Sequence, residues 1–396
     1  MGAHLYDLSP ALRLMLMGMV IALGPLAWVW ARHKNAPTAR RLRVLTMVTL
    51  FLTFDLVLFG AFTRLTDSGL GCPDWPGCYG HASPVGAMRH IDAAQDVMPT
   101  GPVTRSKAWI EMIHRYLATG VGVLILTLTV LTWKAWRDVR RLSFAQQPDT
   151  ADIVSLWWPA ITLFWVCVQG AFGALTVTMK LFPAIVTLHL LGGMGLLALL
   201  RAQTVRLPQR DGRGLPTPLN AGMRRLVVAG FALLWMQIAL GGWVSTNYAV
   251  LACTDFPACQ NSFWPAMDFK QGFTLWRALG AGKNADEYIS FDALTAIHYA
   301  HRLAAYLLFA VLIALAARLR RVAALRAQAV WLAALTLLQV ATGLSNVVLG
   351  WPLLAAVAHT CGAAALVIVM TGIVLSSRGV RPALTGASLA ASRVPA

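Results

Sequence analysis

Histidine residues inside apolar stretches are the residues of this sequence best suited to chemistry. The chain of 396 residues has nine histidines. Five of them fall in stretches that are apolar enough to cross a membrane, namely His114, His189, His298, His301 and His359. Ionisable groups inside a bilayer cost free energy, so each of these is a functional candidate by default. Histidine is also a common axial ligand of heme iron.

Four of these histidines fall at matched depths in their apolar stretches. His114 lies about six residues into one stretch and His189 about five into another, which places both roughly 8 to 9 Å below the same face. His301 and His359 repeat this arrangement later in the chain. Two imidazoles at equal depth on facing helices can bind one heme iron from opposite sides. The sequence therefore predicts two heme sites, one for each pair.

Packing is the simpler role for a single buried histidine, because imidazole can hydrogen-bond across helices. Four histidines at matched positions favour ligation instead, and two of them are followed by arginine. Arg115 and Arg302 are the expected partners of heme propionates, since guanidinium pairs with a carboxylate through two hydrogen bonds. Snorkelling to the outer interface is the alternative role of both arginines.

Glu111 makes the two predicted sites different. It lies one helical turn before His114 on the same face, whereas His298 holds the corresponding place before His301. A carboxylate beside one site indicates that the reaction takes place there, with the other site storing or passing electrons. Glu111 would then stabilise a cationic intermediate or accept a proton. Its alternative role is a buried ion pair with an arginine, and His298 is an alternative ligand to His301.

Zinc and non-heme iron are the rival metals. Zinc sites combine histidine with cysteine or carboxylate, and neither stands at ligand spacing around each of the in-span histidines. Non-heme iron usually binds two histidines and a carboxylate, and only the first site offers one, Glu111. Heme is therefore the expected group.

The elements that must hold these residues are membrane helices. Hydrophobic residues make up 58% of the chain and charged residues 12%, with a mean hydropathy of +0.63, which is too apolar for a soluble protein of this length. A helical span needs roughly 20 apolar residues. Nine such runs lie near 11–31, 45–63, 108–133, 155–177, 184–200, 226–247, 294–317, 328–348 and 354–376. No small-residue cleavage site follows the first run, so we expect a span rather than a signal peptide.

The positive charges predict how the chain crosses the membrane. The formal charge of +17 is carried by residues in short loops, which is typical of a membrane protein and argues against nucleic-acid binding. Alternate loops and the C-terminal tail collect 22 Lys and Arg, against 8 in the other loops. Basic loops stay in the cytoplasm, so we expect the N-terminus outside, the C-terminus inside and membrane lipid around a multi-pass protein.

An internal repeat is expected to organise the helices. Gln169 precedes His189 by 20 residues, and Gln339 precedes His359 by the same 20. The fold class predicted is thus an all-α polytopic membrane protein with two tandem four-helix bundles and one extra N-terminal helix. The expected parts are an extra helix with a basic loop (1–43), a first half (44–204), a cytoplasmic linker (205–224), a second half (225–378) and a cytoplasmic tail (379–396).

Each long outer loop carries a pair of cysteines separated by five residues. Disulfides persist on an oxidising face, so we predict bonds that join Cys72 to Cys78 and Cys253 to Cys259. Loop stapling and a redox role for the first pair both stay open. The two other cysteines, Cys167 and Cys361, fall inside helices and are expected to act as small apolar residues.

The combined motifs resemble those of heme A synthases, in particular bacterial members with cysteine pairs in the outer loops. The matching residues are Gly60-Ala-Phe-Thr-Arg64-Leu-Thr-Asp67-Ser-Gly69-Leu-Gly-Cys72-Pro-Asp-Trp-Pro-Gly-Cys78, followed by Glu111-x-x-His114-Arg115. The likeness extends across all four helices of both halves, whereas the helix at 11–31 adds a ninth span to the usual eight of the family.

The resemblance implies a function and a place in the cell. His114 and His189 would hold heme O as substrate, His301 and His359 would hold a heme b cofactor, and Glu111 would be the catalytic glutamate. The C8 methyl group of heme O would be hydroxylated twice and lose water to give the formyl group of heme A, with electrons leaving through the second heme to a membrane acceptor. The family also implies a bacterial inner membrane, a heme O synthase and cytochrome oxidase assembly factors as partners.

Two other functions need the same four histidines. A diheme b-type electron carrier would pass electrons to or from a quinone without changing a porphyrin, and Glu111 would then be incidental. A heme delivery protein would exchange heme at one site without oxidising it. Only the synthase converts heme O to a hydroxylated heme and then to heme A, so the bound porphyrins distinguish the three.

Overall fold

Membrane helices build the whole fold. The computed structural model describes residues 9–141, 155–210, 216–277 and 288–378. Within them, nine helices are long and apolar enough to cross a membrane, which confirms the predicted all-α polytopic fold and its nine spans. They are α1 (Ser9–Arg32), α2 (Thr38–Leu65), α4 (Arg105–Arg141), α5 (Trp157–Thr178), α6 (Pro183–Arg210), α7 (Ala221–Thr246), α9 (Phe291–Leu319), α10 (Arg326–Val348) and α11 (Leu353–Ser376).

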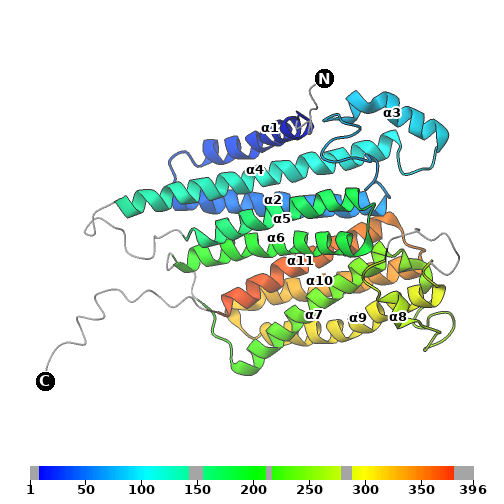
Figure 1. The fold of residues 1–396 in the computed structure, drawn as a ribbon. Coiled ribbons are helices and arrows are strands. Elements are labelled where there is room, and N and C mark those ends of the chain that lie inside the picture. Colours follow the sequence, from blue (N-terminus) through cyan, green and yellow to red (C-terminus); the bar gives the residue numbers. More distant parts are fainter. Residues whose placement is uncertain (1–8, 142–154, 211–215, 278–287, 379–396) are drawn as a thin grey trace.

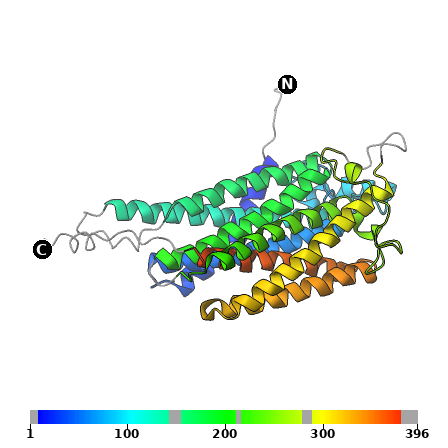
Figure 2. The same cartoon turned by 90° about the horizontal axis from the view of Figure 1, so that it is seen from below.

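Eight of these helices form two rings of four that lie side by side (Figures 1 and 2). In the first ring α2 packs on α4, α4 on α5, α5 on α6, and α6 back on α2. The second ring repeats this order with α7, α9, α10 and α11. Consequently α4 lies diagonally across from α6, and α9 across from α11. Side chains on two diagonal helices can therefore face each other through the middle of a ring.

The two rings pack against each other through α2 and α6 on one side and α7 and α11 on the other. One large apolar cluster spans the contact and joins Met194 and Leu197 of α6 to Val227 and Leu234 of α7. At one end of the helices, Arg64 of α2 donates from Nη2 to the carbonyl oxygen of Ser245, over 2.7 Å. At the opposite end, Arg206 of α6 donates from Nη1 to the carbonyl oxygen of Arg378, just after α11, over 2.6 Å. The rings are thus held by apolar packing along the helices and by hydrogen bonds at both ends.

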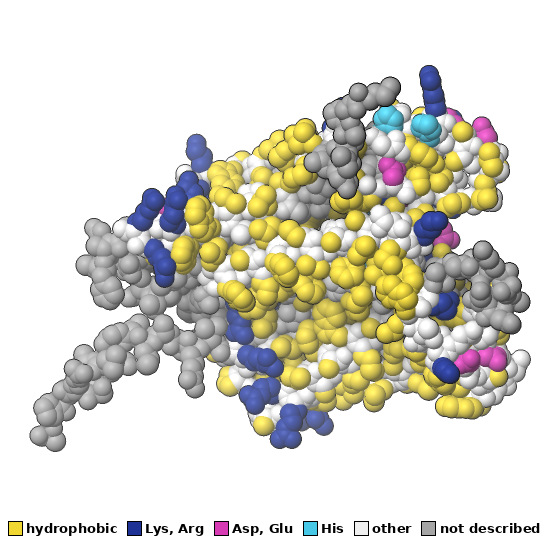
Figure 3. Space-filling model, viewed as in Figure 1, with side chains coloured by type: hydrophobic (Ala, Val, Ile, Leu, Met, Phe, Trp, Pro, Cys, Tyr) yellow, Lys and Arg dark blue, Asp and Glu magenta, His cyan; other side chains and the backbone are white. Residues whose placement is uncertain are grey.

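The connecting segments and the charges mark two different ends of the molecule. Both cysteine-bearing loops lie at one end, here called the loop end, together with α3 (Pro84–Val97), η3 (Ala249–Ala252) and α8 (Phe269–Gly272). Lys and Arg gather at the opposite end, here called the basic end, where η5 (Ala323–Leu325) also lies, and an apolar belt separates the two ends (Figure 3). Such a belt between charged ends is the surface that a bilayer requires.

Helix boundaries refine the predicted parts of the chain. Helix α6 runs to Arg210 and α7 begins at Ala221, so much of the predicted linker continues these helices. The predicted tail at 379–396 lies outside the described residues. The division into halves and the internal repeat stay predictions, although the two rings connect their helices in the same order.

Helix α1 lies outside both rings and packs mainly on α4. Close contact with α4 needs a glycine at position 18, because a Cβ atom there would lie 2.4 Å from the Cγ2 atom of Thr119 and 2.9 Å from its backbone carbon. A Cβ at Gly24 of the same helix would meet nothing within 4 Å.

Replacing Gly18 by leucine is therefore expected to push α1 away from α4. Overpacking of this kind costs about 1–3 kcal/mol, so the Tm of the purified protein should fall by about 2 to 5 °C. Gly24→Leu is the matched control and should leave the Tm unchanged. Equal Tm values for the two variants would show that α1 does not depend on this contact.

Candidate heme sites

The first histidine pair spans the first ring. His114 on α4 and His189 on α6 are close enough to interact electrostatically, as the diagonal places of the two helices allow. The Nδ1 atoms of both rings are buried without a hydrogen-bond partner among the described residues, while each side chain keeps some accessible surface. Buried imidazole nitrogens without partners are costly, and the two rings could serve as ligands of one heme iron.

Glycines on the other two helices make room for these imidazoles. A Cβ atom at Gly60 of α2 would lie 2.9 Å from Cε1 of His114, and one at Gly173 of α5 would lie 3.5 Å from Cε1 of His189. The first distance is too short for any side chain without movement of the imidazole. Gly60 thus offers bare backbone where an imidazole needs space, whereas a Cβ at Gly173 would make ordinary van der Waals contact with His189.

The second pair repeats the arrangement in the second ring. His301 on α9 and His359 on α11 also interact electrostatically. A Cβ atom at Gly241 of α7 would lie 3.0 Å from Cε1 of His301, and one at Gly343 of α10 would lie 3.3 Å from Cε1 of His359. The structure therefore brings together both of the predicted pairs, each across the diagonal of one ring.

The second pair differs in its hydrogen bonds. The amide nitrogen of Gln237 on α7 lies 3.0 Å from Nδ1 and 3.3 Å from Nε2 of His301, and Oγ1 of Thr342 on α10 lies 2.9 Å from Nδ1 of His359. A hydrogen bond to Nδ1 alone, as in His359, fixes the orientation of an imidazole and leaves Nε2 for a metal. Gln237 and Thr342 were missed by sequence analysis, because neither has a counterpart in the first half that would draw attention to it.

Glu111 lies between α4 and the first cysteine loop. It is buried, with 4% of its surface exposed. One carboxylate oxygen pairs with Nη2 of Arg115, and the other accepts a hydrogen bond of 2.8 Å from the backbone N–H of Cys72. The structure thus contains the buried ion pair that was the alternative role of Glu111, one turn from His114. Its catalytic role stays a prediction.

Both arginines that follow a histidine are turned toward the loops. Arg115 donates from Nη1 to the carbonyl oxygens of Asp74, Pro76 and Gly77. Arg302 donates to those of Cys253, Asp255 and Ala258. Each guanidinium therefore ties its helix to a cysteine loop, which the sequence did not reveal. A propionate role for either arginine stays a prediction, and in this structure those donors bind backbone oxygens.

His298 uses both ring nitrogens within the protein. Its Nδ1 lies 3.0 Å from the carbonyl oxygen of Ala249, and its Nε2 accepts from Nε of Arg302 over 3.3 Å. This side chain takes the place that Glu111 holds in the first half, beside the following arginine. Its contacts favour His301 as the ligand of the second pair.

The four loop cysteines form the two predicted disulfides, Cys72 to Cys78 and Cys253 to Cys259. A carboxylate closes each loop. Asp74 accepts from the backbone N–H groups of Tyr79 and Gly80, and Asp255 accepts from those of Gln260 and Asn261 over 2.7 and 2.9 Å. Cys167 and Cys361 are free thiols in helices, as predicted.

These features define a class of protein: a multi-pass membrane protein in which two four-helix rings each hold a pair of facing histidines. Within the described residues no three His, Cys, Asp or Glu side chains gather as a metal-ion site. The family model named COX15-CtaA, cytochrome oxidase assembly protein, matches residues 43–371. The chain therefore belongs to this family.

Curated relatives match over almost the same length. A heme A synthase of Shewanella oneidensis is 38% identical over 329 residues, which cover 83% of this chain and 94% of that protein. Heme A synthases of Halalkalibacterium halodurans and Methylobacterium radiotolerans are 27% and 28% identical, over 81% and 83% of this chain and 91% and 88% of their own lengths.

The second cysteine loop should depend on pH. The N–H group of Asn261, and then that of Gln260, hold the pKa of the Asp255 carboxyl below its usual value. A depressed pKa means that Asp255 stabilises the loop above the ordinary pKa of aspartate, and that this stability is lost as the pH falls through the lowered value. Asp255→Asn should imitate that loss at pH 7 and speed proteolysis within 253–262, while Asp138→Asn at the basic end should not. Unchanged proteolysis of Asp255→Asn would contradict this role.

Proposed function

We propose that this chain is a heme A synthase, which oxidises the C8 methyl group of heme O to the formyl group of heme A. The observation that carries the proposal is the first histidine pair, whose Nδ1 atoms have no hydrogen-bond partner in the described part of the chain and of which His114 lies one turn from a buried glutamate. The heme A synthases that match most of this chain support the same activity.

The two sites take different porphyrins in this proposal. His114 and His189 would hold the iron of heme O, the substrate, as its protein ligands. His301 and His359 hold heme b, and their Nδ1 contacts to Gln237 and Thr342 keep the imidazoles in a fixed orientation suited to a permanent cofactor. When bound, heme b supplies one-electron redox chemistry.

Glu111 is the proposed catalytic residue. Burial makes the negative charge of its carboxylate costly, and Arg115 together with the N–H group of Cys72 offsets that cost. A carboxylate held in this way can accept a proton or stabilise positive charge as the methyl group is oxidised. The disulfide from Cys72 to Cys78 fixes the loop that supplies this N–H group, which supports a positioning role for the disulfide.

The second half has no equivalent acid. His298 stands in the place of Glu111 and pairs with Arg302 and a backbone oxygen. This difference supports oxidation in the first half and electron transfer in the second. A diheme electron carrier or a heme delivery protein would give no reason for the difference.

The proposal includes a location and partners. The loop end faces the outside of a bacterial inner membrane, since the basic end belongs in the cytoplasm and disulfides belong on an oxidising side. The N-terminus is then outside and the C-terminus inside. Heme O synthase, cytochrome oxidase assembly factors and a membrane electron acceptor are the proposed partners.

Conversion of heme O tests the proposal directly. Membranes of a host that makes heme O should contain heme A when they carry the native chain. Glu111→Gln should lower the rate of heme A formation by about 100-fold or more, the usual contribution of a general acid or base, while heme b remains bound. Acid extraction and chromatography of the hemes measure both. Undiminished heme A with the variant would exclude Glu111 from catalysis, and heme O left unchanged by the native chain would favour a carrier or delivery protein.

The glycines that face the imidazoles provide a second test. A side chain at Gly60 must displace His114, and overpacking costs about 1–3 kcal/mol, which corresponds to roughly 5- to 150-fold weaker binding. Gly60→Val should therefore weaken binding of heme O and leave heme b in place. Gly241→Val should do the reverse, and Gly122→Val on α4, where a Cβ meets nothing within 4 Å, should change neither. Optical spectra of the purified variants distinguish these outcomes, and loss of both hemes from Gly60→Val would contradict separate sites.

A further inference from the structure

The interior of the first ring is polar toward the basic end. Thr46, Thr49 and Thr53 lie on one face of α2, and their exposed fractions are 0%, 0% and 1%. Thr132 of α4 and Gln203 of α6 are both 2% exposed. Thr162 of α5 is also fully buried and accepts a hydrogen bond of 2.9 Å from the amide of Gln203. All four helices of the ring thus contribute buried polar side chains, and we call these six residues the polar column.

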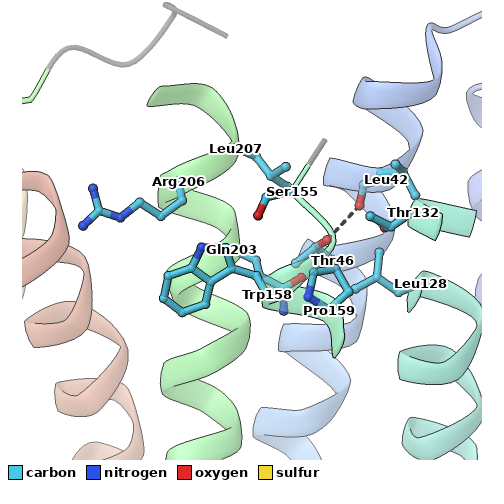
Figure 4. A pocket seen from close by; sticks show the side chains of 10 residues that line it. All are labelled: Leu42, Thr46, Leu128, Thr132, Ser155, Trp158, Pro159, Gln203, Arg206 and Leu207. Atoms are coloured by element: carbon cyan, nitrogen blue, oxygen red, sulfur yellow. Dashed lines mark hydrogen bonds between the residues drawn. The ribbon is translucent and has the colours of Figure 1, made fainter. Parts of the chain in front are cut away.

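A small cavity lies among these side chains. Figure 4 shows Thr46, Thr132 and Gln203 around it, together with apolar residues that include Leu42, Leu128 and Pro159. Its volume is about 20 Å³, as mapped by the centre of a water-sized sphere. A cavity of this size has room for about one water molecule, and the side chains of Thr46, Thr132 and Gln203 are polar groups that could bind it.

The positions of the second ring that correspond to this column are apolar, although Thr336 and Thr371 are buried elsewhere in that ring. Each polar residue has a corresponding position in the second ring, which is found by counting along the helix from a residue that both rings share. The shared residues are Gly60 and Gly241, His114 and His301, Gln169 and Gln339, and His189 and His359. All six corresponding residues are buried and apolar: Val227, Gly230, Leu234, Leu319, Leu332 and Ile373. Apart from Gly230, they belong to the large apolar cluster that joins the rings.

Helix packing does not account for this difference. Threonine hydroxyls are common between membrane helices, but that role would apply to both rings alike. The hydroxyls of Thr46, Thr49 and Thr53 donate to the carbonyl oxygens four residues earlier over 2.7 to 2.8 Å. The lone pairs of each hydroxyl oxygen stay available to accept a hydrogen bond from water.

The column leads from the basic end toward the first histidine pair. From Thr46 to Thr53 it covers about 10 Å, and about 10 Å more separates Thr53 from Gly60, which faces His114. Gln169 of α5 lies along this second distance, one turn before Gly173 and with its amide against Gly192. Gln169 therefore continues the polar groups toward the site, in a part of the ring that also holds the buried apolar cluster of Val121, Ile125, Leu196 and Leu200.

We propose that the polar column is a hydrated path that carries protons between the basic end and the interior of the first ring. Its use in catalysis rests on the proposed function. With water as the source of oxygen, conversion of a methyl group to a formyl group consumes one water and releases four protons and four electrons. Two molecules of a membrane quinone balance this reaction, because each takes up two electrons and two protons. Protons must therefore leave the first ring, and the second ring, which only passes electrons, needs no such path.

Exchange of a buried thiol with D2O tests the hydration without any bound heme. The background chain carries Cys167→Ala and Cys361→Ala, which remove its free thiols. Thr46→Cys and Val227→Cys are then made separately, so that each variant has one thiol at one of two corresponding positions that are both 0% exposed. The S–H stretch in the infrared should convert to S–D at least about 100-fold faster at position 46 than at position 227. The reason is that the rates of hydrogen exchange at accessible and at protected sites differ by many orders of magnitude. Equal rates would overturn the proposal.

Substitution of the column tests its use. The triple variant T46V/T49V/T53V gives α2 apolar side chains of similar size. Thr336→Val is the control, because Thr336 is a buried threonine of the second ring whose hydroxyl also donates to the carbonyl oxygen four residues earlier. The triple variant should lower heme A formation at least tenfold and raise the solvent isotope effect, with unchanged heme content. An unchanged rate and isotope effect would overturn the role in proton transfer. Failure of the native chain to form heme A would instead refute the proposed function, and the thiol result would still stand.

Discussion

The rest of the structure depends on one constraint, which is that two imidazoles must face each other deep in a bilayer. An ionisable group at that depth is costly unless it has a partner. Diagonal helices of a four-helix ring supply the facing geometry, and the two remaining helices supply glycine where each imidazole comes close. The same solution is used in both rings, so the spacing of four histidines and four glycines determines most of the architecture.

The cysteine loops follow from that constraint. A residue one turn before His114 or His301 lies near the loop end, where Glu111 meets the backbone of the first cysteine loop and His298 meets that of η3. Arginine, which comes directly after the histidine, uses its donors on the carbonyl oxygens of the loop in both halves. The disulfide and the closing aspartate hold these oxygens in place. The loops thus cover the histidine pairs and fix the one acidic group beside the first pair.

Much of this could be predicted from the sequence, because apolar length and charge bias in a membrane protein follow simple rules. The nine spans, the disulfides and the pairing of His114 with His189 and of His301 with His359 were all predictable. The contacts of Arg115 were not, since a sequence does not show whether guanidinium meets a propionate or a backbone oxygen. Gly173 and Gly343 also escaped notice, because a glycine in a membrane helix has many roles. The polar column appears only when burial is known, because a threonine in an apolar run reads as an ordinary span residue.

The central claim is that the first histidine pair holds the substrate porphyrin and the second holds a different, permanent heme. Purified His114→Ala and His301→Ala chains from a host that makes heme O test it most directly, through identification of the heme that each retains. The account predicts that His114→Ala loses heme O and keeps heme b, whereas His301→Ala loses heme b and keeps a heme with a farnesyl chain. Retention of the same heme mixture by both variants would contradict it.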